Sequence, residues 1–185
     1  IKPNGAIVLF GGQPFTSALI MSNPKYFKYC WTWNKKQSTG FLNAKKQPLR
    51  VVEDVCVFYK KQPTYNPIME VRGKPRNKGG YINKGGSDNY GTYHNTEAFN
   101  NVYYPKNLLE ISNAKQKGKQ HPTQKPIALM EYLIKTYTNE NETVLDFTMG
   151  SGSTGVAAKN LNRSFIGIEL DDKYFEIAEN RIDNT

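Results

Sequence analysis

Residues 143–171 constrain the fold of this chain more than any other stretch. An apolar run stops at Asp146, a turn containing Gly150 and Gly152 follows, and a helical stretch leads to a second apolar run that stops at Glu169. This order predicts a β-α-β unit. The glycines let the backbone approach a ligand closely, and an acid after the second strand is placed to accept hydrogen bonds from a ribose. The stretch therefore predicts a site for an adenosine-containing small molecule.

The glycine spacing is also compatible with a nicotinamide dinucleotide, but two features count against that ligand. Three residues, 147–149, separate Asp146 from the first glycine, and no chain remains after Arg181 for a second mononucleotide half. A P-loop is excluded because no Gly-Lys-Ser/Thr follows the glycines. S-adenosylmethionine fits better. Glu169 would bind its ribose, Leu170 and Phe147 would form an apolar adenine slot, and the turn would accept its charged amino-acid tail.

Composition points to a folded protein with a polyanionic partner. The chain has 185 residues and a net charge of +9, which favours nucleic acid first and an anionic membrane second. No apolar run approaches the ~20 residues that span a membrane. Cys30 and Cys56 lie in apolar runs without Cys-x-x-Cys spacing, so we expect buried reduced thiols and a cytoplasmic protein, and no metal site.

The pattern of apolar residues predicts an α/β chain with an insertion. We expect strands at 6–10, 26–33, 51–59 and in the two runs described above, with a loop at 34–50. The run at 6–10 is apolar throughout, which is typical of a buried strand in a parallel sheet. Helices are expected at 15–21, after Pro126 and at 174–182.

Residues 60–120 differ in character from the rest of the chain. They carry eleven cations against four acids, interleaved with tyrosines, and show little periodicity. Cations that meet phosphates and rings that pack on sugars or bases suit a nucleic-acid surface, although a merely solvated insertion is the alternative. The expected DNA contacts are the basic residues of this segment and of the 34–50 loop: Arg72, Lys74, Arg76, Lys78, Lys84, Lys35, Lys36, Lys45 and Lys46.

Three motifs together resemble the amino DNA methyltransferases, which act on adenine N6 or cytosine N4. They are His-Pro-Thr-Gln-Lys-Pro at 121–126, Asp-Phe-Thr-Met-Gly-Ser-Gly-Ser-Thr at 146–154 and Ile-Gly-Ile-Glu-Leu at 166–170. Their order matches the subgroup whose cofactor motif follows its catalytic motif. The upstream strands are similar to the family as well, so the resemblance covers most of the chain, and in its detailed style it resembles methyltransferases of phages and prophages.

The resemblance implies a Rossmann-like class I methyltransferase sheet, incomplete in this chain, with a basic loop-rich insertion. Residues 1–59 would form the catalytic-side half, 60–120 the DNA target-recognition insertion and 121–185 the S-adenosylmethionine-binding half. The turn would surround the methionine part of the cofactor, Glu169 would hold the ribose, and two residues of the 121–126 motif would lie at the carboxylate and amino end. The implied cofactor-binding residues are Thr123, Lys125, Asp146, Phe147, Thr148, Met149, Gly150, Ser151, Gly152, Ser153, Thr154, Glu169 and Leu170.

The family's catalytic tetrapeptide, Asp-Pro-Pro-Tyr or a close variant, does not occur in this sequence. The family places it before the strand at 6–10, so we expect it upstream of Ile1, in an amino-terminal segment of the same protein. That segment would supply a central strand between the strands that begin near Ala6 and Thr143. Without it, we expect residues 1–185 to be unstable, because burial of each large apolar side chain contributes ~1.5–3 kcal/mol.

The sequence thus predicts a DNA methyltransferase of a restriction-modification system in a bacterial or phage-infected cell. It would transfer a methyl group from S-adenosylmethionine to the exocyclic amine of a flipped base in double-stranded DNA, adenine N6 before cytosine N4, and release S-adenosylhomocysteine. Two other hypotheses stay open: a non-catalytic DNA-binding remnant of a prophage enzyme, and a methyltransferase of RNA or protein. A homodimer is also compatible with the sequence.

Overall fold

The computed structural model describes residues 1–78, 82–83, 93–94, 97–113 and 119–185. The chain forms two compact units. The larger comprises Ile1–Asn66 and Lys106–Thr185, and the smaller comprises Pro67–Pro105. Among the described residues, no helix is both long and apolar enough to cross a membrane.

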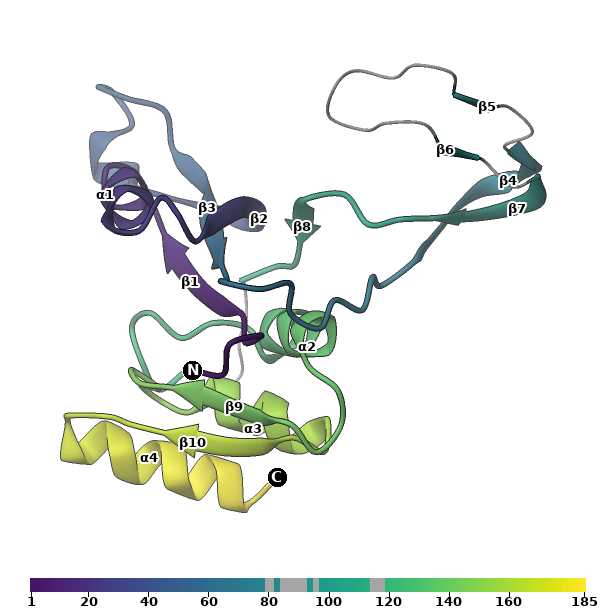
Figure 1. The fold of residues 1–185 in the computed structure, drawn as a ribbon. Helices are drawn as coiled ribbons and strands as arrows, with labels where there is room; N and C mark the ends of the chain where they lie inside the picture. The colour runs from purple at the N-terminus through teal and green to yellow at the C-terminus, as the bar shows by residue number, and fades with distance from the viewer. Residues whose placement is uncertain (79–81, 84–92, 95–96, 114–118) are drawn as a thin grey trace. The chain divides into compact units, whose positions relative to one another are not determined.

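A four-stranded mixed sheet forms one layer of the larger unit (Figure 1). Its strands, in spatial order, are β1 (Ile7–Gly11), β3 (Arg50–Phe58), β2 (Phe27–Thr39) and β8 (Leu108–Glu110). β3 runs antiparallel to both of its neighbours, and β8 runs parallel to β2. The sequence predicts a buried strand of a parallel sheet at 6–10, whereas the described ladder of β1 is antiparallel and its residues are half-buried; a parallel neighbour on its other edge stays a prediction. Helix α1 (Phe15–Ser22) follows β1, as predicted.

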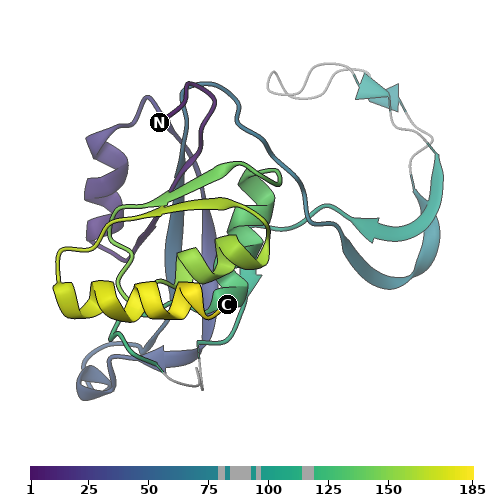
Figure 2. The same cartoon turned by 90° about the horizontal axis from the view of Figure 1, so that it is seen from below.

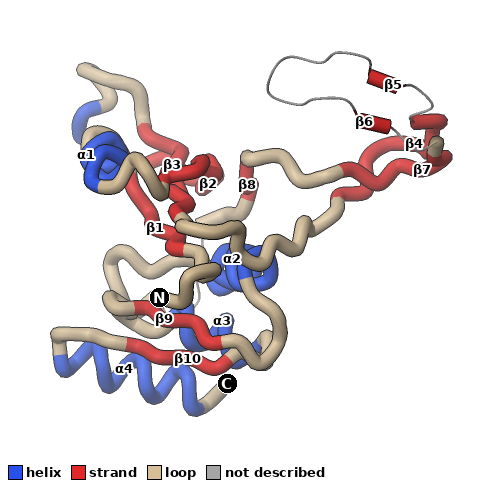
Figure 3. Tube along the Cα trace, in the orientation of Figure 1, coloured by secondary structure: helices blue, strands red, loops and turns tan. Residues whose placement is uncertain are grey.

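The β2–β3 hairpin is longer than expected. β2 continues through the polar residues to Thr39, and a short 3-10 helix, η1 (Phe41–Asn43), lies in the hairpin tip, residues 40–49, before β3 begins at Arg50 (Figure 3). The prediction of a loop from residue 34 onward was wrong for residues 34–39. Backbone pairing of Asn34 with Val52 and of Thr39 with Arg50 extends the strand, and such pairing does not require apolar side chains.

The carboxy-terminal part contains the predicted β-α-β unit. β9 (Thr143–Asp146) and β10 (Ser164–Gly167) pair in parallel, and α3 (Ser153–Asn160) connects them. Helix α4 (Asp172–Asp183) follows β10; Figure 2 shows it beside the strand pair. Among the described residues, β9 pairs only with β10 and β1 only with β3, so two separate sheets result. The central strand expected between β1 and β9 stays a prediction.

Helix α2 (Ile127–Tyr137) joins the two sheets through two apolar stripes. Leu129, Leu133 and Tyr137, spaced four residues apart, pack against Trp31 and Trp33 of the mixed sheet in one core cluster. A second stripe, Ile127, Met130 and Ile134, packs with Ala157 and Ala158 of α3 and with Val144 and Phe165 of the β9–β10 pair. Residues three and four apart share a helix face, so one helix serves two cores.

The smaller unit is built on an antiparallel pair within the predicted 60–120 insertion. β4 (Glu70–Lys78) pairs with β7 (Ala98–Tyr103), with a register shift between Val71 and Arg76. The two-residue strands β5 (Ile82–Asn83) and β6 (Tyr93–His94) also pair. The predicted DNA contact Lys84 lies outside the described residues.

Candidate functional site

The turn that follows β9 is shaped by two glycines in left-handed conformations. Gly150 has a φ of +53° and Gly152 a φ of +78°, values that residues with a Cβ rarely adopt. A Cβ on Gly152 would also lie only 2.9 Å from the Cβ of Ala178 on α4. The guanidinium of Arg181, also on α4, donates to the carbonyl of Ser151. Helix α4 therefore packs against the turn and restrains its conformation.

Asp146 closes the turn at its other end. Its Oδ2 accepts a hydrogen bond of 2.5 Å from the hydroxyl of Thr154, and its Oδ1 accepts one of 3.1 Å from the backbone N–H of Thr148. Both carboxylate oxygens of Asp146 thus accept hydrogen bonds from the protein itself, Oδ2 from the start of α3 and Oδ1 from the glycine turn. Asp146 holds the conformation of the turn through these two bonds.

The carboxylate of Glu169 lies directly over the same turn. Its Oε2 accepts the backbone N–H of Gly150 at 2.8 Å, and its Oε1 accepts those of Leu170 and Asp171 at 2.9 and 3.2 Å. These backbone hydrogen bonds, that from Asp171 most of all, outweigh desolvation and lower the pKa of Glu169 below its ordinary value. The carboxylate is therefore ionised at neutral pH and keeps lone pairs for further donors.

Two large apolar side chains near this acid are exposed. Leu170 follows Glu169 directly and is 96% exposed, and Phe147 follows Asp146 at the end of the neighbouring strand and is 57% exposed. An ionised acid with exposed apolar side chains beside it can accept hydrogen bonds from a diol while the side chains contact an aromatic base. The role that the sequence predicts for these residues, in binding an adenosine ligand, stays a prediction.

The 121–126 segment docks onto the turn and brings the two sequence motifs together. The hydroxyl of Ser151 donates to Oε1 of Gln124 at 2.8 Å, and both side chains are buried. The ring of His121 packs edge-on against the ring of Tyr174, with 4.3 Å between the ring centroids. The His121 ring also lies against the turn, since a Cβ on Gly150 would be 3.5 Å from it.

Thr123 is held within its own segment. Its backbone N–H and its hydroxyl lie 3.2 and 3.0 Å from Nδ1 of His121. Since the backbone N–H can only donate, Nδ1 acts as an acceptor here. Gln124, which the sequence did not single out, makes the contact to the turn.

Lys125 is directed away from the turn and toward the mixed sheet. Its Nζ donates to Oε2 of Glu53 at 2.6 Å and lies 4.9 Å from the ring centroid of Phe10. Lys35 donates to the other oxygen of Glu53 at 3.1 Å. Burial alone would raise the pKa of Glu53, but the hydrogen bonds and charges of the two lysines outweigh it and lower that pKa.

This charged cluster borders a hollow of about 480 Å³ at the end of β1. Its lining includes Phe10, Gly11, Lys35, Gly40, Glu53 and Lys125. With Arg50, which also lines it, the hollow combines an aromatic ring, a carboxylate and three cations. No spacing in the sequence pointed to Glu53 as a site residue, because its partners lie 18 and 72 positions away along the chain.

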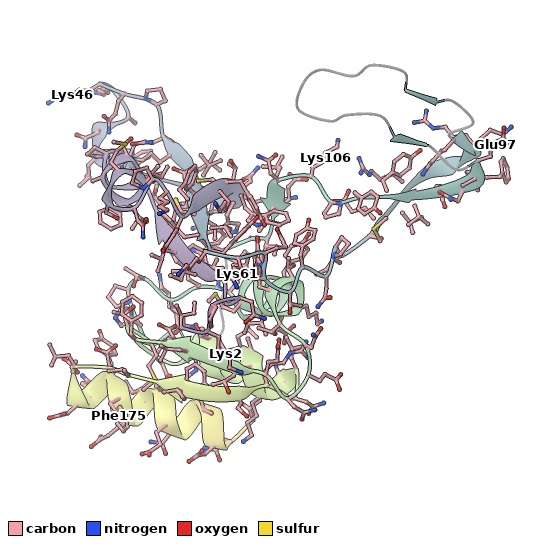
Figure 4. The ribbon with its side chains drawn as sticks, viewed as in Figure 1. Lys2, Lys46, Lys61, Glu97, Lys106 and Phe175 are labelled. Atoms are coloured by element: carbon pink, nitrogen blue, oxygen red, sulfur yellow. The ribbon has the colours of Figure 1, made fainter. Side chains whose placement is uncertain are left out.

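The predicted DNA contacts in the larger unit differ in accessibility. The amine of Lys35 is buried against Glu53, with 6% of its side chain exposed, which argues against the predicted DNA contact there. Lys36 is half-exposed and pairs with Glu110 at 3.5 Å. Lys45 and Lys46 are exposed near the hairpin tip, and Figure 4 shows Lys46 at the far end of the hairpin, pointing away from the sheet.

In the smaller unit, three predicted DNA contacts gather on one tyrosine. The guanidinium groups of Arg72 and Arg76 lie 4.6 and 5.7 Å from the ring centroid of Tyr103, and Nζ of Lys78 lies 3.4 Å from it. Lys78 also donates to the side-chain carbonyl of Asn100 at 2.9 Å. Arg72, Lys74, Arg76 and Tyr103 line a shallow hollow of about 370 Å³, a cationic surface that suits an anion.

The fold and the turn define a class of protein: a Rossmann-like α/β protein with a candidate site for a nucleotide-type ligand in the turn after β9. The family model described as DNA methylase, for the N6 and N4 amino methyltransferases, matches residues 1–180. The chain therefore belongs to the N6/N4 DNA methylase family, and the family expected from the sequence motifs is confirmed.

Similar proteins agree with this assignment. The chain is 31% identical to the type II methyltransferase M.HpaI of Haemophilus parainfluenzae over 100% of its own length and 55% of that protein. It is 28% identical to M.HindIII of Haemophilus influenzae, covering 98% of the chain and 64% of that protein. The chain therefore spans between about half and two thirds of these relatives.

Solved structures give the same picture. The crystal structure of the M1.HpyAVI–SAM complex matches with a TM-score of 0.68 and 31% identity, covering 99% of this chain and 76% of the other. The cytosine-N4-specific PvuII DNA methyltransferase matches with a TM-score of 0.59 at 21% identity and supports the fold alone. The predicted class I methyltransferase fold is thereby confirmed.

The two lysines on Glu53 generate a prediction for stability against pH. Because the folded pKa of Glu53 is lowered, its contribution to stability is present above the unfolded pKa of about 4.3 and is lost as pH falls through the folded pKa. Glu53→Gln should lower the free energy of unfolding by about 1–3 kcal/mol at neutral pH, since it leaves Lys35 buried without a carboxylate.

Urea unfolding of both proteins between pH 7 and pH 3 measures this difference, which should shrink toward the acid end. Glu140→Gln, at an exposed acid in the turn before β9, is the matched control. A difference that stays constant over the whole pH range would contradict the assigned charge interaction.

Proposed function

We propose that the protein is a type II DNA methyltransferase that transfers a methyl group from S-adenosylmethionine to an exocyclic amine of double-stranded DNA. The observation that carries the proposal is the ionised carboxylate of Glu169, held against the glycine turn by the N–H of Gly150. Its neighbours Phe147 and Leu170 expose apolar surface where an adenine would pack. The complex of the similar protein M1.HpyAVI with SAM supports the same ligand.

The residues of the turn fit this cofactor. Glu169 has lone pairs free to accept hydrogen bonds from the two ribose hydroxyls, and Gly150 and Gly152 let the backbone approach without a Cβ in the way. The first residues of α3, Ser153 and Thr154, form the positive end of a helix, which would attract the carboxylate of the cofactor. When bound, S-adenosylmethionine supplies the electrophilic methyl group.

The two predicted cofactor residues of the 121–126 segment, Thr123 and Lys125, have different partners. Thr123 contacts His121, which packs on Gly150, whereas Lys125 pairs with Glu53. We therefore assign Thr123 to the cofactor side. Lys125 contributes by holding Glu53 at the wall of the hollow beside Phe10, where a flipped base would enter.

For the acceptor we take adenine N6 first and cytosine N4 as the alternative. Incubation of the protein with labelled S-adenosylmethionine and double-stranded DNA, followed by nucleoside analysis of the product, distinguishes N6-methyladenine from N4-methylcytosine. Parallel reactions with RNA and with protein test the other acceptor classes. DNA binding without any transfer would instead support the non-catalytic remnant.

Glu169→Ala is expected to weaken S-adenosylmethionine binding about ten- to a hundredfold, as expected for loss of hydrogen bonds to a charged group. Isothermal titration with the cofactor measures the effect, and DNA affinity should change less than about twofold because Glu169 belongs to the cofactor turn. Glu176→Ala, at an exposed position on α4, is the control. Equal losses of cofactor and DNA affinity would show that the substitution disrupts the fold instead.

Replacing Lys74 and Arg76 with Ala is expected to weaken DNA binding and to reduce its salt dependence. The slope of log K against log salt is negative, and removing one cation that binds a phosphate should reduce its magnitude by ~0.9. Lys78 is left in place because it also bonds Asn100 and packs on Tyr103, so its removal would disturb the hairpin. The control variant, Lys135→Ala/Lys173→Ala, removes the same amount of charge from exposed positions on α2 and α4. Equal slopes for both variants would identify the insertion as a solvated surface.

A further inference from the structure

The tip of the β2–β3 hairpin exposes two large apolar side chains in succession. Phe41 is 80% exposed and Leu42 is 99% exposed, and both belong to the 3-10 helix η1. Neither side chain contributes to the two core clusters, so the fold gains no stability from burying them. Side chains of this size presented together on a projecting tip usually serve contact with another molecule.

The tip is ordered by its own backbone. The N–H of Asn43 donates to the carbonyl of Gly40 at 3.0 Å, that of Ala44 to Phe41 at 3.0 Å, and that of Lys46 to Asn43 at 2.8 Å. Gly40 has a φ of +89°, which starts the turn out of β2. These bonds present Phe41 and Leu42 on a short helical turn, so little conformational entropy is lost when they are buried in a complex.

The charge around the tip indicates its partner. Residues 34–52 contain five cations and no acid, and Lys45 and Lys46 lie directly beyond η1 with exposed side chains. An apolar tip flanked by free cations suits a polyanion that also offers apolar surface, which is duplex DNA with its phosphates and stacked bases. A cationic flank of this kind does not favour an ordinary apolar protein surface.

The position of the tip connects it to the charged hollow. Thr39, Gly40 and Arg50, at the base of the tip, line the hollow together with Phe10 and Glu53. The apolar side chains therefore rise from the rim of the cavity that the proposed function assigns to the flipped base. A wedge beside such a cavity can enter a base step and occupy the space that the departing base leaves.

We propose that Phe41 and Leu42 form a wedge that inserts into duplex DNA beside the hollow and stabilises the extrahelical base, while Lys45 and Lys46 bind the adjacent phosphates. The inference rests on the proposed function, since it requires a DNA substrate. Phe41 and Leu42 would then be positioning residues, which act on the duplex and not on the reacting atoms.

The test measures how tightly the whole protein binds two different DNA probes. One probe is a short mixed-sequence duplex with 2-aminopurine at its centre, and the other is the same duplex with a central bulged adenine. Phe41→Ala/Leu42→Ala should bind the matched duplex about tenfold more weakly and the bulged duplex less than about twofold more weakly, because a bulged base is already unstacked. The rise in 2-aminopurine fluorescence on binding should fall in parallel.

Phe15→Ala/Met21→Ala, which removes two exposed apolar side chains from α1, is the matched control and should bind both probes as the unmodified protein does. Unchanged cofactor affinity shows that each variant folds. Equal losses on the two probes, or no loss on either, would overturn the wedge while leaving the methyl-transfer assay and the proposed function standing. Failure of the unmodified protein to bind either duplex would overturn both.

Discussion

The buried hydrogen bond between Ser151 and Gln124 joins the two halves of the candidate site. A buried hydroxyl or amide without a partner costs stability, so this contact fixes the 121–126 segment on the glycine turn. The same segment then delivers Lys125 to Glu53 on the mixed sheet. Helix α2, which follows directly, packs its two apolar stripes against both sheets. The 121–126 segment therefore links the glycine turn, the charged hollow and, through α2, the two core clusters.

Seven described cations of this basic chain fall into two groups with different physical roles. Lys35, Lys125 and Lys78 are committed to partners inside the protein: a carboxylate for the first two, and a ring and an amide for the third. Lys45, Lys46, Lys74 and Arg76 lie at the hairpin tip or on the hollow beside Tyr103, where they face solvent. Net charge indicates a polyanionic partner, and among these seven cations the second group is placed to neutralise phosphates.

Local patterns predicted the β9–α3–β10 unit and its acids well, because alternation, glycines and strand-ending carboxylates all act within a few residues. The same reasoning missed the extension of β2 through residues 34–39, where cross-strand pairing with β3 outweighs the polar composition. It also missed Glu53, whose importance comes from two lysines far away in the chain. The β4–β7 pair lies in the segment that the sequence predicts to be loop-rich, since its strands have no alternating apolar face.

The sequence by itself determined the glycine turn after β9, the order of the motifs and the family, because each depends on short runs of contiguous residues. Tertiary structure alone decided which side chains face the site. It paired Lys125 with Glu53 and buried Lys35. It also left Phe41 and Leu42 exposed directly after Gly40, which lines the hollow. Long side chains choose partners across the fold by distance and desolvation, and neither quantity can be read from their positions along the chain.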